Sequence, residues 1–129
     1  MNRVNTALTN WAPYGLSLLR IVVGLLFLQH GLVKLFGFPM PFQNPVAVGS
    51  LIWYQGIIEV IGGPLLILGL LTRPVAFILS GLMAAAYFMV HLSMSFFPAL
   101  NFGEPAVLYC FIFLYLAAAG PGTWALDRG

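Results

Sequence analysis

The sequence predicts an all-α integral membrane protein, built as a bundle of four transmembrane helices with both termini in the cytoplasm. Of its 129 residues, 61% are hydrophobic and only 6% are charged. The mean hydropathy of +1.00 lies far above the range of soluble proteins. The apolar residues gather in four stretches, each close to the roughly 20 residues that a helix needs to cross a bilayer. A chain of this length predicts a single domain over residues 1–129.

Helix-breaking residues separate the four predicted spans. Prolines between Phe38 and Pro45 end the first helix, and Pro98 with Asn101 separate the third from the fourth. We predict a tight turn at Thr72-Arg73-Pro74, because proline is tolerated in the first turn of a helix. The spans are Tyr14–Phe36, Leu51–Leu71, Pro74–Leu92 and Glu104–Gly120.

The distribution of basic residues predicts the orientation. Four spans place both termini on the side of the 72–74 turn, and this side holds Arg3, Arg73 and Arg128. The opposite loops hold only Lys34, at a helix end. The positive-inside rule therefore puts both termini in the cytoplasm. A net charge of +2 without a basic cluster argues against nucleic-acid binding.

Ionisable residues occur inside the predicted spans, where each costs several kcal/mol or more unless it faces a partner or a cavity. They are Arg20, His30 and Lys34 in the first span, Glu59 in the second, His91 in the third and Glu104 at the start of the fourth.

Side-chain direction predicts that these groups meet in the outer half of the bundle. Helical side chains lean toward their own N-terminus, so His30 and Lys34 lean inward while Gln55 and Glu59 lean outward. Each pair has a spacing of four and shares one helix face. We predict an outward-opening pocket with Glu59 and His30 as the proton-exchanging, catalytic residues. The predicted ligand-binding residues are Lys34, Gln55, His91, Asn101, Glu104 and Trp53, and the predicted aromatic walls are Phe27, Trp53, Tyr54, Tyr87 and Phe88.

Each of these groups also has a plainer explanation. Glu59 could be a protonated carboxyl or half of a purely structural ion pair, and both histidines could be hydrogen-bonded packing residues. Lys34 could snorkel outward, and Glu104 could only stabilise the start of a helix. We predict a structural or lipid-facing role for Arg20, which could reach the inner headgroups.

The sequence favours no metal site. It has no His-x-x-x-His or Cys-x-x-Cys spacing, and the single Cys110 has no second thiol. A haem held between His30 and His91 stays an open alternative.

Small residues repeat at close-packing intervals along the spans. Gly24 and Gly31 share a face of the first span, Gly56 and Gly63 share a face of the second, and Gly81 and Ala85 form a pair in the third. We expect these residues to pack the bundle, with dimer contacts as the alternative.

Several short motifs together resemble the DoxX family of small four-helix bacterial membrane proteins. They are Leu19-Arg20, His30-Gly31-x-x-Lys34-Leu35, Gly56-x-x-Glu59-x-x-Gly62-Gly63, Gly69-Leu70, Thr72-Arg73, His91, Asn101-x-Gly103-Glu104, Gly120-Pro121-Gly122 and Leu126-Asp127. The resemblance extends over nearly the whole chain and implies location in the bacterial inner membrane.

The resemblance implies two classes of function. Members of the family are linked with a thiosulfate:quinone oxidoreductase and with membrane redox complexes, which implies a quinone-linked redox subunit. Distant relatives act in assembly, which implies a non-catalytic scaffold or small-ligand-binding protein; transport of a small solute is a third possibility. The chain has no complete catalytic set and no covalent cofactor motif, so whether it is an enzyme stays open. The expected partners are the bilayer, a redox subunit or a second copy, and the expected cofactor is quinone.

Overall fold

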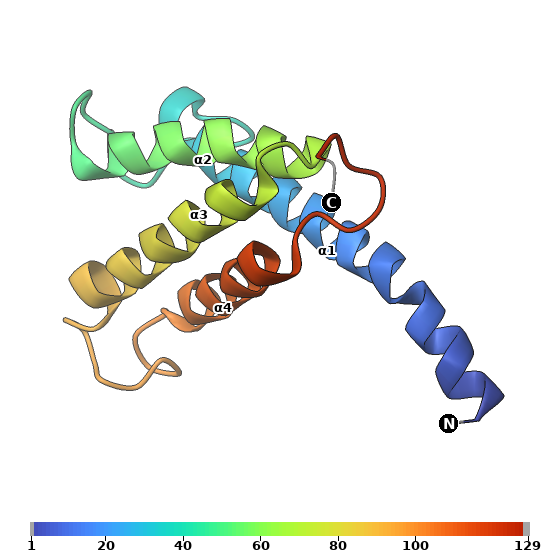
Figure 1. Ribbon diagram of the computed structural model, residues 1–129. Helices are drawn as coiled ribbons and strands as arrows, with labels where there is room; N and C mark the ends of the chain where they lie inside the picture. Colours follow the sequence, from blue (N-terminus) through green and yellow to red (C-terminus); the bar gives the residue numbers. More distant parts are fainter. Residues whose placement is uncertain (1, 128–129) are drawn as a thin grey trace.

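Within residues 2–127, the regular structure consists of four α-helices and one short π-helical segment (Figure 1). The computed structural model describes residues 2–127, and no strand occurs among them. The all-helical prediction is therefore confirmed; Arg128, used above to predict the orientation, lies outside the described residues. The elements are α1 (Arg3–Phe36), α2 (Leu51–Leu68), α3 (Thr72–Ala86), the π-helix η1 (Tyr87–His91) and α4 (Glu104–Ala119).

Three of these helical segments are long and apolar enough to cross a membrane: α1, α2, and α3 continued by η1 to His91. Helix α4 has 16 residues, which is a length of about 24 Å at 1.5 Å per residue. Large apolar side chains on the outside of the bundle, such as Phe77, Phe88 and Phe111, are about two-thirds exposed (65, 66 and 64%). Lipid tails solvate such a surface, so the chain is a membrane protein.

Helix α1 begins eleven residues earlier than the predicted first span. The Asn2 side chain accepts a hydrogen bond from the Asn5 backbone N–H at 2.9 Å and caps the helix. Residues 3–13 mix polar and apolar types, so a search for an apolar span begins only at Tyr14. Pro13 lies inside the continuous helix.

The turn between α2 and α3 also differs from the prediction. Helix α2 ends at Leu68 because Gly69 adopts a left-handed conformation (φ 67°), and Leu71 is left-handed as well (φ 54°). The turn thus occupies residues 69–71, and Thr72 and Arg73 already belong to α3.

Glycines bring α1 and α2 into backbone contact. A methyl group added to Gly63 would lie 2.8 Å from both the Gly24 carbonyl oxygen and the Leu28 backbone nitrogen. These two helices pack more extensively than any other pair. Gly81 of α3 differs, because it is exposed and an added methyl group would meet no other segment of residues 2–127 within 4 Å. The expectation that Gly81 packs the bundle is therefore wrong.

The core joins α1 to α4 through aromatic rings. Phe27 is 2% exposed and meets Phe113 edge-on, with ring centroids 4.7 Å apart. The ring of Tyr109 also meets the ring of Phe27 edge-on, with centroids 5.0 Å apart. Between α3 and α4, the buried Ser80 hydroxyl donates to the Cys110 carbonyl oxygen at 2.8 Å.

Arg20 ties the C-terminal segment to the end of the bundle. Its side chain is fully buried and donates to the carbonyl oxygens of Leu66 (2.8 Å) and Trp124 (2.7 Å), and also to those of Pro121 and Thr123. The guanidinium is thus bound by carbonyl dipoles rather than by headgroups. The suggestion that Arg20 faces lipid is corrected, because the folded-back segment covers it.

Asp127 completes this closure by capping α3. Its carboxylate accepts from the backbone N–H groups of Leu71 and Thr72, both at 2.8 Å, and its own backbone N–H donates to the Gly69 carbonyl oxygen at 2.8 Å. Donation by the Thr72 backbone N–H lowers the pKa of Asp127 below its usual 3.8, despite the opposing effect of burial. The three elements at this end, α1, the α2–α3 turn and the C-terminal segment, are thereby held together.

We predict that Gly63→Ala destabilises the bundle whereas Gly81→Ala does not. Alanine favours a helix over glycine by about 1 kcal/mol. At Gly63 the forced separation of α1 and α2 outweighs this gain, with a net loss of about 1–3 kcal/mol. Thermal unfolding of both variants in one detergent measures the difference. Equal melting temperatures for the two variants would show that α1 and α2 are not in close contact.

We predict that Asp127→Ala lowers the free energy of unfolding near neutral pH by about 1–2 kcal/mol, the usual worth of a helix cap. Because the pKa of Asp127 is lowered in the folded protein, its contribution is present above the usual value of 3.8 and disappears as the pH falls through the lowered value. The difference between wild type and variant should therefore shrink in acid. A difference that stays constant down to pH 2 would contradict a charged cap.

Candidate functional site

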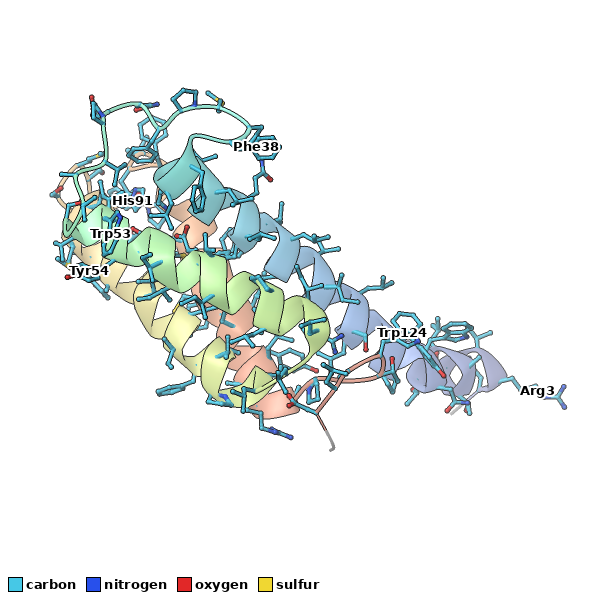
Figure 2. All side chains as sticks on the ribbon, turned by 90° about the horizontal axis from the view of Figure 1, so that it is seen from above. Arg3, Phe38, Trp53, Tyr54, His91 and Trp124 are labelled. Atoms are coloured by element: carbon cyan, nitrogen blue, oxygen red, sulfur yellow. The ribbon has the colours of Figure 1, made fainter. Side chains whose placement is uncertain are left out.

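A cavity of about 150 Å³ lies between the helices, at the end of the bundle opposite to Arg3 and Trp124. Figure 2 shows His91 and Trp53 at this end, and Trp124 and Arg3 at the other. All four helices contribute to the cavity, together with η1 and the segment before α4. The lining residues are Phe27, His30, Lys34, Gln55, Glu59, Met83, Ala86, His91, Phe102, Pro105, Ala106 and Tyr109.

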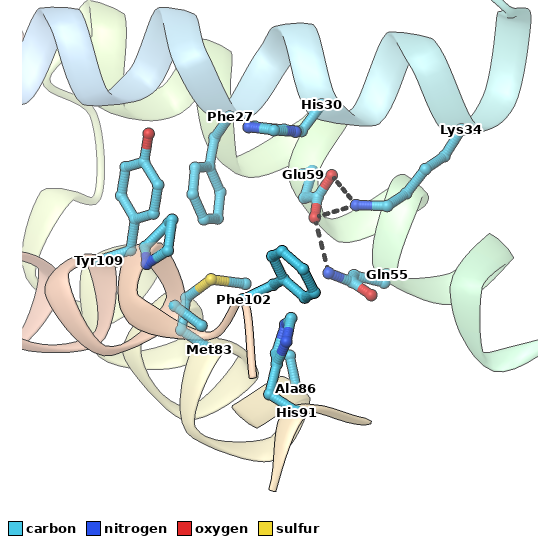
Figure 3. A pocket seen from close by; sticks show the side chains of 12 residues that line it. Phe27, His30, Lys34, Gln55, Glu59, Met83, Ala86, His91, Phe102 and Tyr109 are labelled. Atoms are coloured by element: carbon cyan, nitrogen blue, oxygen red, sulfur yellow. Dashed lines mark hydrogen bonds and ion pairs between the residues drawn. The ribbon is translucent and has the colours of Figure 1, made fainter. Parts of the chain in front are cut away.

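One wall of the cavity is a triad of polar side chains from α1 and α2 (Figure 3). The Lys34 ammonium donates to both oxygens of Glu59, at 2.8 and 3.0 Å, and the Gln55 amide donates to the first oxygen at 3.0 Å. The Glu59 side chain is 2% exposed and that of Lys34 is 11% exposed. The structure therefore pairs Lys34 with Glu59, and the suggestion that Lys34 snorkels to the surface is corrected.

Glycines make room for this triad. Gly31 of α1 faces Glu59, whose Cβ would lie 3.0 Å from an added methyl group. Gly56 of α2 faces Lys34 in the same way, at 3.1 Å. Each charged side chain thus emerges opposite a residue without a side chain, which lets the lysine and the carboxylate meet across two closely packed helices.

The opposite wall is aromatic and apolar. Phe27 and Tyr109 form one side, with Met83 and Phe102 beside them (Figure 3). Phe102 has a positive φ of 59°, a conformation that costs free energy in a residue with a bulky side chain. The buried Asn101 holds this turn: its amide donates to the Ser95 carbonyl oxygen at 3.0 Å and its side-chain oxygen accepts from the Gly103 N–H at 2.8 Å.

The two histidines border the cavity differently. His91 Nδ1 lies 2.8 Å from the Asn101 carbonyl oxygen. Because a carbonyl only accepts, Nδ1 carries the proton, and Nε2 of the neutral ring is left as an acceptor. His30 is exposed, lies edge-on to Phe27 with centroids 6.3 Å apart, and makes no hydrogen bond to any residue from 2 to 127.

The helix that carries His91 changes its winding just before the site. Residues Tyr87–His91 form a π-helical turn, in which the Leu92 backbone N–H donates to the Tyr87 carbonyl oxygen at 2.9 Å. A π-turn inserts one extra residue and rotates the following side chains, and such turns often occur at functional sites.

The structure thus brings together five of the predicted site residues, namely Glu59, His30, Lys34, Gln55 and His91. Three others do not line the cavity. Trp53 lies two positions before Gln55, and residues two apart on a helix do not face the same way. Its ring packs against Tyr54 instead of lining the cavity. Asn101 is buried within its own turn, and Glu104 is exposed in the first turn of α4.

The aromatic wall was only partly predicted. Phe27 lines the cavity, but Tyr54, Tyr87 and Phe88 do not. Tyr109 and Phe102 were missed. The hydroxyl group of Tyr109, which is unusual in an apolar helix, is a signal that could have identified it. The local sequence gives no such signal for Phe102 except its position between Asn101 and Gly103.

The arrangement can hold one small ring between an aromatic wall and a polar wall. Lys34 and Gln55 offer hydrogen-bond donors, Glu59 offers acceptors, and the two imidazoles offer ring nitrogens for further hydrogen bonds. A ligand with oxygen atoms on the ring edge matches this chemistry.

Comparison with known proteins identifies the family of the chain. The family model described as DoxX matches residues 15–92, which is more than half of the chain and includes all five clustered residues. The match ends before α4, so it is shorter than the resemblance predicted from the motifs. An uncharacterized protein of Haemophilus influenzae is 45% identical over 126 residues, which is 94% of each chain. No solved structure matches the chain. The chain belongs to the DoxX family.

Proposed function

We propose that the protein is a quinone-binding subunit of a membrane redox complex, with the quinone ring in the cavity beside the Lys34–Glu59 pair. The observation that supports this is a ring-sized cavity with one aromatic wall and one hydrogen-bonding wall. An apolar cavity of about 150 Å³ in another protein binds benzene, so the size suits a single six-membered ring.

The side chains around the cavity suit both the oxidised quinone and the reduced quinol. A quinone carbonyl would accept from Lys34 or Gln55, and the ring would pack against Phe27. When a quinol is oxidised, its two hydroxyl protons would pass to His30 and Glu59 and its two carbonyls would re-form. The two electrons would pass to a partner subunit that carries an electron acceptor.

A second function, a non-catalytic scaffold or assembly protein, has support from the same triad. Lys34 satisfies both oxygens of Glu59 without any ligand, so the pair also fastens α1 to α2. Under this alternative the polar cluster fixes helix register or recognises a partner, and quinone does not bind.

For the arrangement in the membrane, we propose that α4 is a fourth span and that both termini lie in the cytoplasm of a bacterium. Helix α4 is apolar after Glu104 and packs along α3. Arg3 and Arg73 lie on the side of the termini, as the positive-inside rule requires. The cavity would then open toward the outer face of the inner membrane.

We predict that Glu59→Gln and His30→Ala each weaken the binding of a short-chain quinol by about tenfold or more, because each removes an acceptor for one of the quinol hydroxyls. Titration of the purified protein in detergent measures the affinity. Glu104→Gln is the matched control, since Glu104 is exposed outside the cavity and its change should leave the affinity unaltered.

A double variant separates binding from folding. Glu59→Gln alone leaves a largely buried lysine unpaired, which costs about 3–5 kcal/mol of stability. Lys34→Met combined with Glu59→Gln removes both charges and should restore the stability but not the quinone affinity. Wild-type affinity in the stable double variant would rule out this pocket as the quinone site.

We predict that a reporter active only in the cytoplasm is active when fused after Asp127 and inactive when inserted between Pro98 and Leu100. The two positions flank α4 and lie on opposite sides only if that helix crosses the bilayer. Equal reporter activity at both positions would show that α4 does not span the membrane.

A further inference from the structure

The N-terminal part of α1 extends beyond the bundle, and among residues 2–127 only its last turn meets another segment, where Tyr14 packs against Trp124. Residues 3–15 are exposed throughout, and Figure 1 shows this part of α1 running out to one side of the other three helices. The whole helix is about 51 Å long at 1.5 Å per residue, whereas the hydrocarbon core of a bilayer is about 30 Å thick. About two-fifths of α1 therefore lies beyond a simple crossing.

This extension is amphipathic. At about 100° of rotation per residue, its apolar residues fall on one half of the helix circumference, led by Val4, Leu8 and Trp11. The polar residues Asn5, Thr6, Thr9 and Asn10, with Arg3 at the boundary, fall on the other half. Val4, Leu8 and Trp11 are 64, 65 and 66% exposed, so residues 2–127 leave most of the apolar half uncovered.

The apolar half continues the lipid-facing side of α1. On the same helical pattern, Val4, Leu8 and Trp11 are followed by Leu18, Val22 and Leu25, which are exposed in the membrane-crossing part. The polar half instead continues the side that faces the bundle, where Arg20 and Gly24 are buried. The N-terminal part of α1 leans away from the bundle (Figure 1). Its lipid-facing, apolar half is therefore turned toward the bilayer surface, and its polar half is turned toward water.

Aromatic rings mark the level at which the extension leaves the bundle. Trp11, Tyr14 and Trp124 form a chain with ring centroids 5.3 and 5.4 Å apart. Tryptophan and tyrosine favour the headgroup level. Pro13 lies between the first two and has no backbone N–H to donate to the Thr9 carbonyl, so the helix bends most easily at this point.

We propose that residues 3–14 form an interfacial anchor that lies on the surface of the same bilayer, with Val4, Leu8 and Trp11 inserted below the headgroups. The partner is the phospholipid surface itself, bound through apolar contact, because the polar half carries only the charge of Arg3. The anchor would fix the tilt of α1 at the end of the bundle that Arg20 and Asp127 hold closed.

Paired labels on the two faces of the extension test this proposal. In the full chain with Cys110→Ser, Leu8→Cys or Asn10→Cys is labelled with a fluorophore, and the protein is placed in phosphatidylcholine vesicles. Both positions are exposed, so neither label disturbs packing. We expect brominated lipid to quench the Leu8 label several-fold more than the Asn10 label, and aqueous iodide to show the reverse preference.

Other outcomes overturn the proposal. Strong iodide quenching at both positions would place the segment in water. Protection of the Leu8 label from both quenchers would instead show a protein partner, such as a second copy of the chain. Lipid quenching that appears only after anionic phosphatidylglycerol is added would show that charge, and not apolar insertion, holds the segment.

Discussion

A charge within the hydrocarbon layer needs polar partners, and this requirement shapes both ends of the bundle. At one end the Lys34 ammonium occupies both oxygens of Glu59, and Gln55 adds a third hydrogen bond. At the other end Arg20 binds backbone carbonyls, including those of the C-terminal segment, and hydrogen-bonds to no carboxylate of residues 2–127. Each charged group therefore dictates a piece of tertiary structure: the first couples α1 to α2, and the second folds the segment after α4 back over the α2–α3 turn.

The glycines are what allow the first of these pairings. A lysine and a glutamate on adjacent helices meet at 2.8 Å only where the two backbones run close together. Gly24 and Gly63 provide that contact near the middle of the helices, and Gly31 and Gly56 clear the space opposite Glu59 and Lys34. Helix contact and polar site are thus parts of one arrangement. A larger residue at these glycines would separate α1 from α2 and lengthen the ion pair at the same time.

Local sequence was enough to predict the helices and the polar wall, because both depend on short-range spacing. Residues four apart share a helix face, which placed His30 with Lys34 and Gln55 with Glu59 correctly around one cavity. It was not enough for contacts that depend on turns. Trp53, Asn101 and Glu104 are close to the site in sequence, but helix rotation and the left-handed turn at Phe102 direct them elsewhere. Arg20 looked like a residue free to reach lipid because its partners come from a segment about a hundred residues later.

Helix packing alone does not explain why the Lys34–Glu59 pair lies beside the cavity. Buried ion pairs are often no more stabilising than well-packed apolar residues of the same size, since desolvation offsets most of the attraction. Gly24 and Gly63 already bring α1 and α2 together without any charge. An ion pair that only joined these helices could be enclosed between their apolar side chains. The Lys34–Glu59 pair instead borders the cavity, opposite Phe27 and beside the two histidines. Under the proposed function, the carboxylate, the ammonium and the two imidazoles around this space of about 150 Å³ would bind the oxygen atoms of a small ring and exchange its protons.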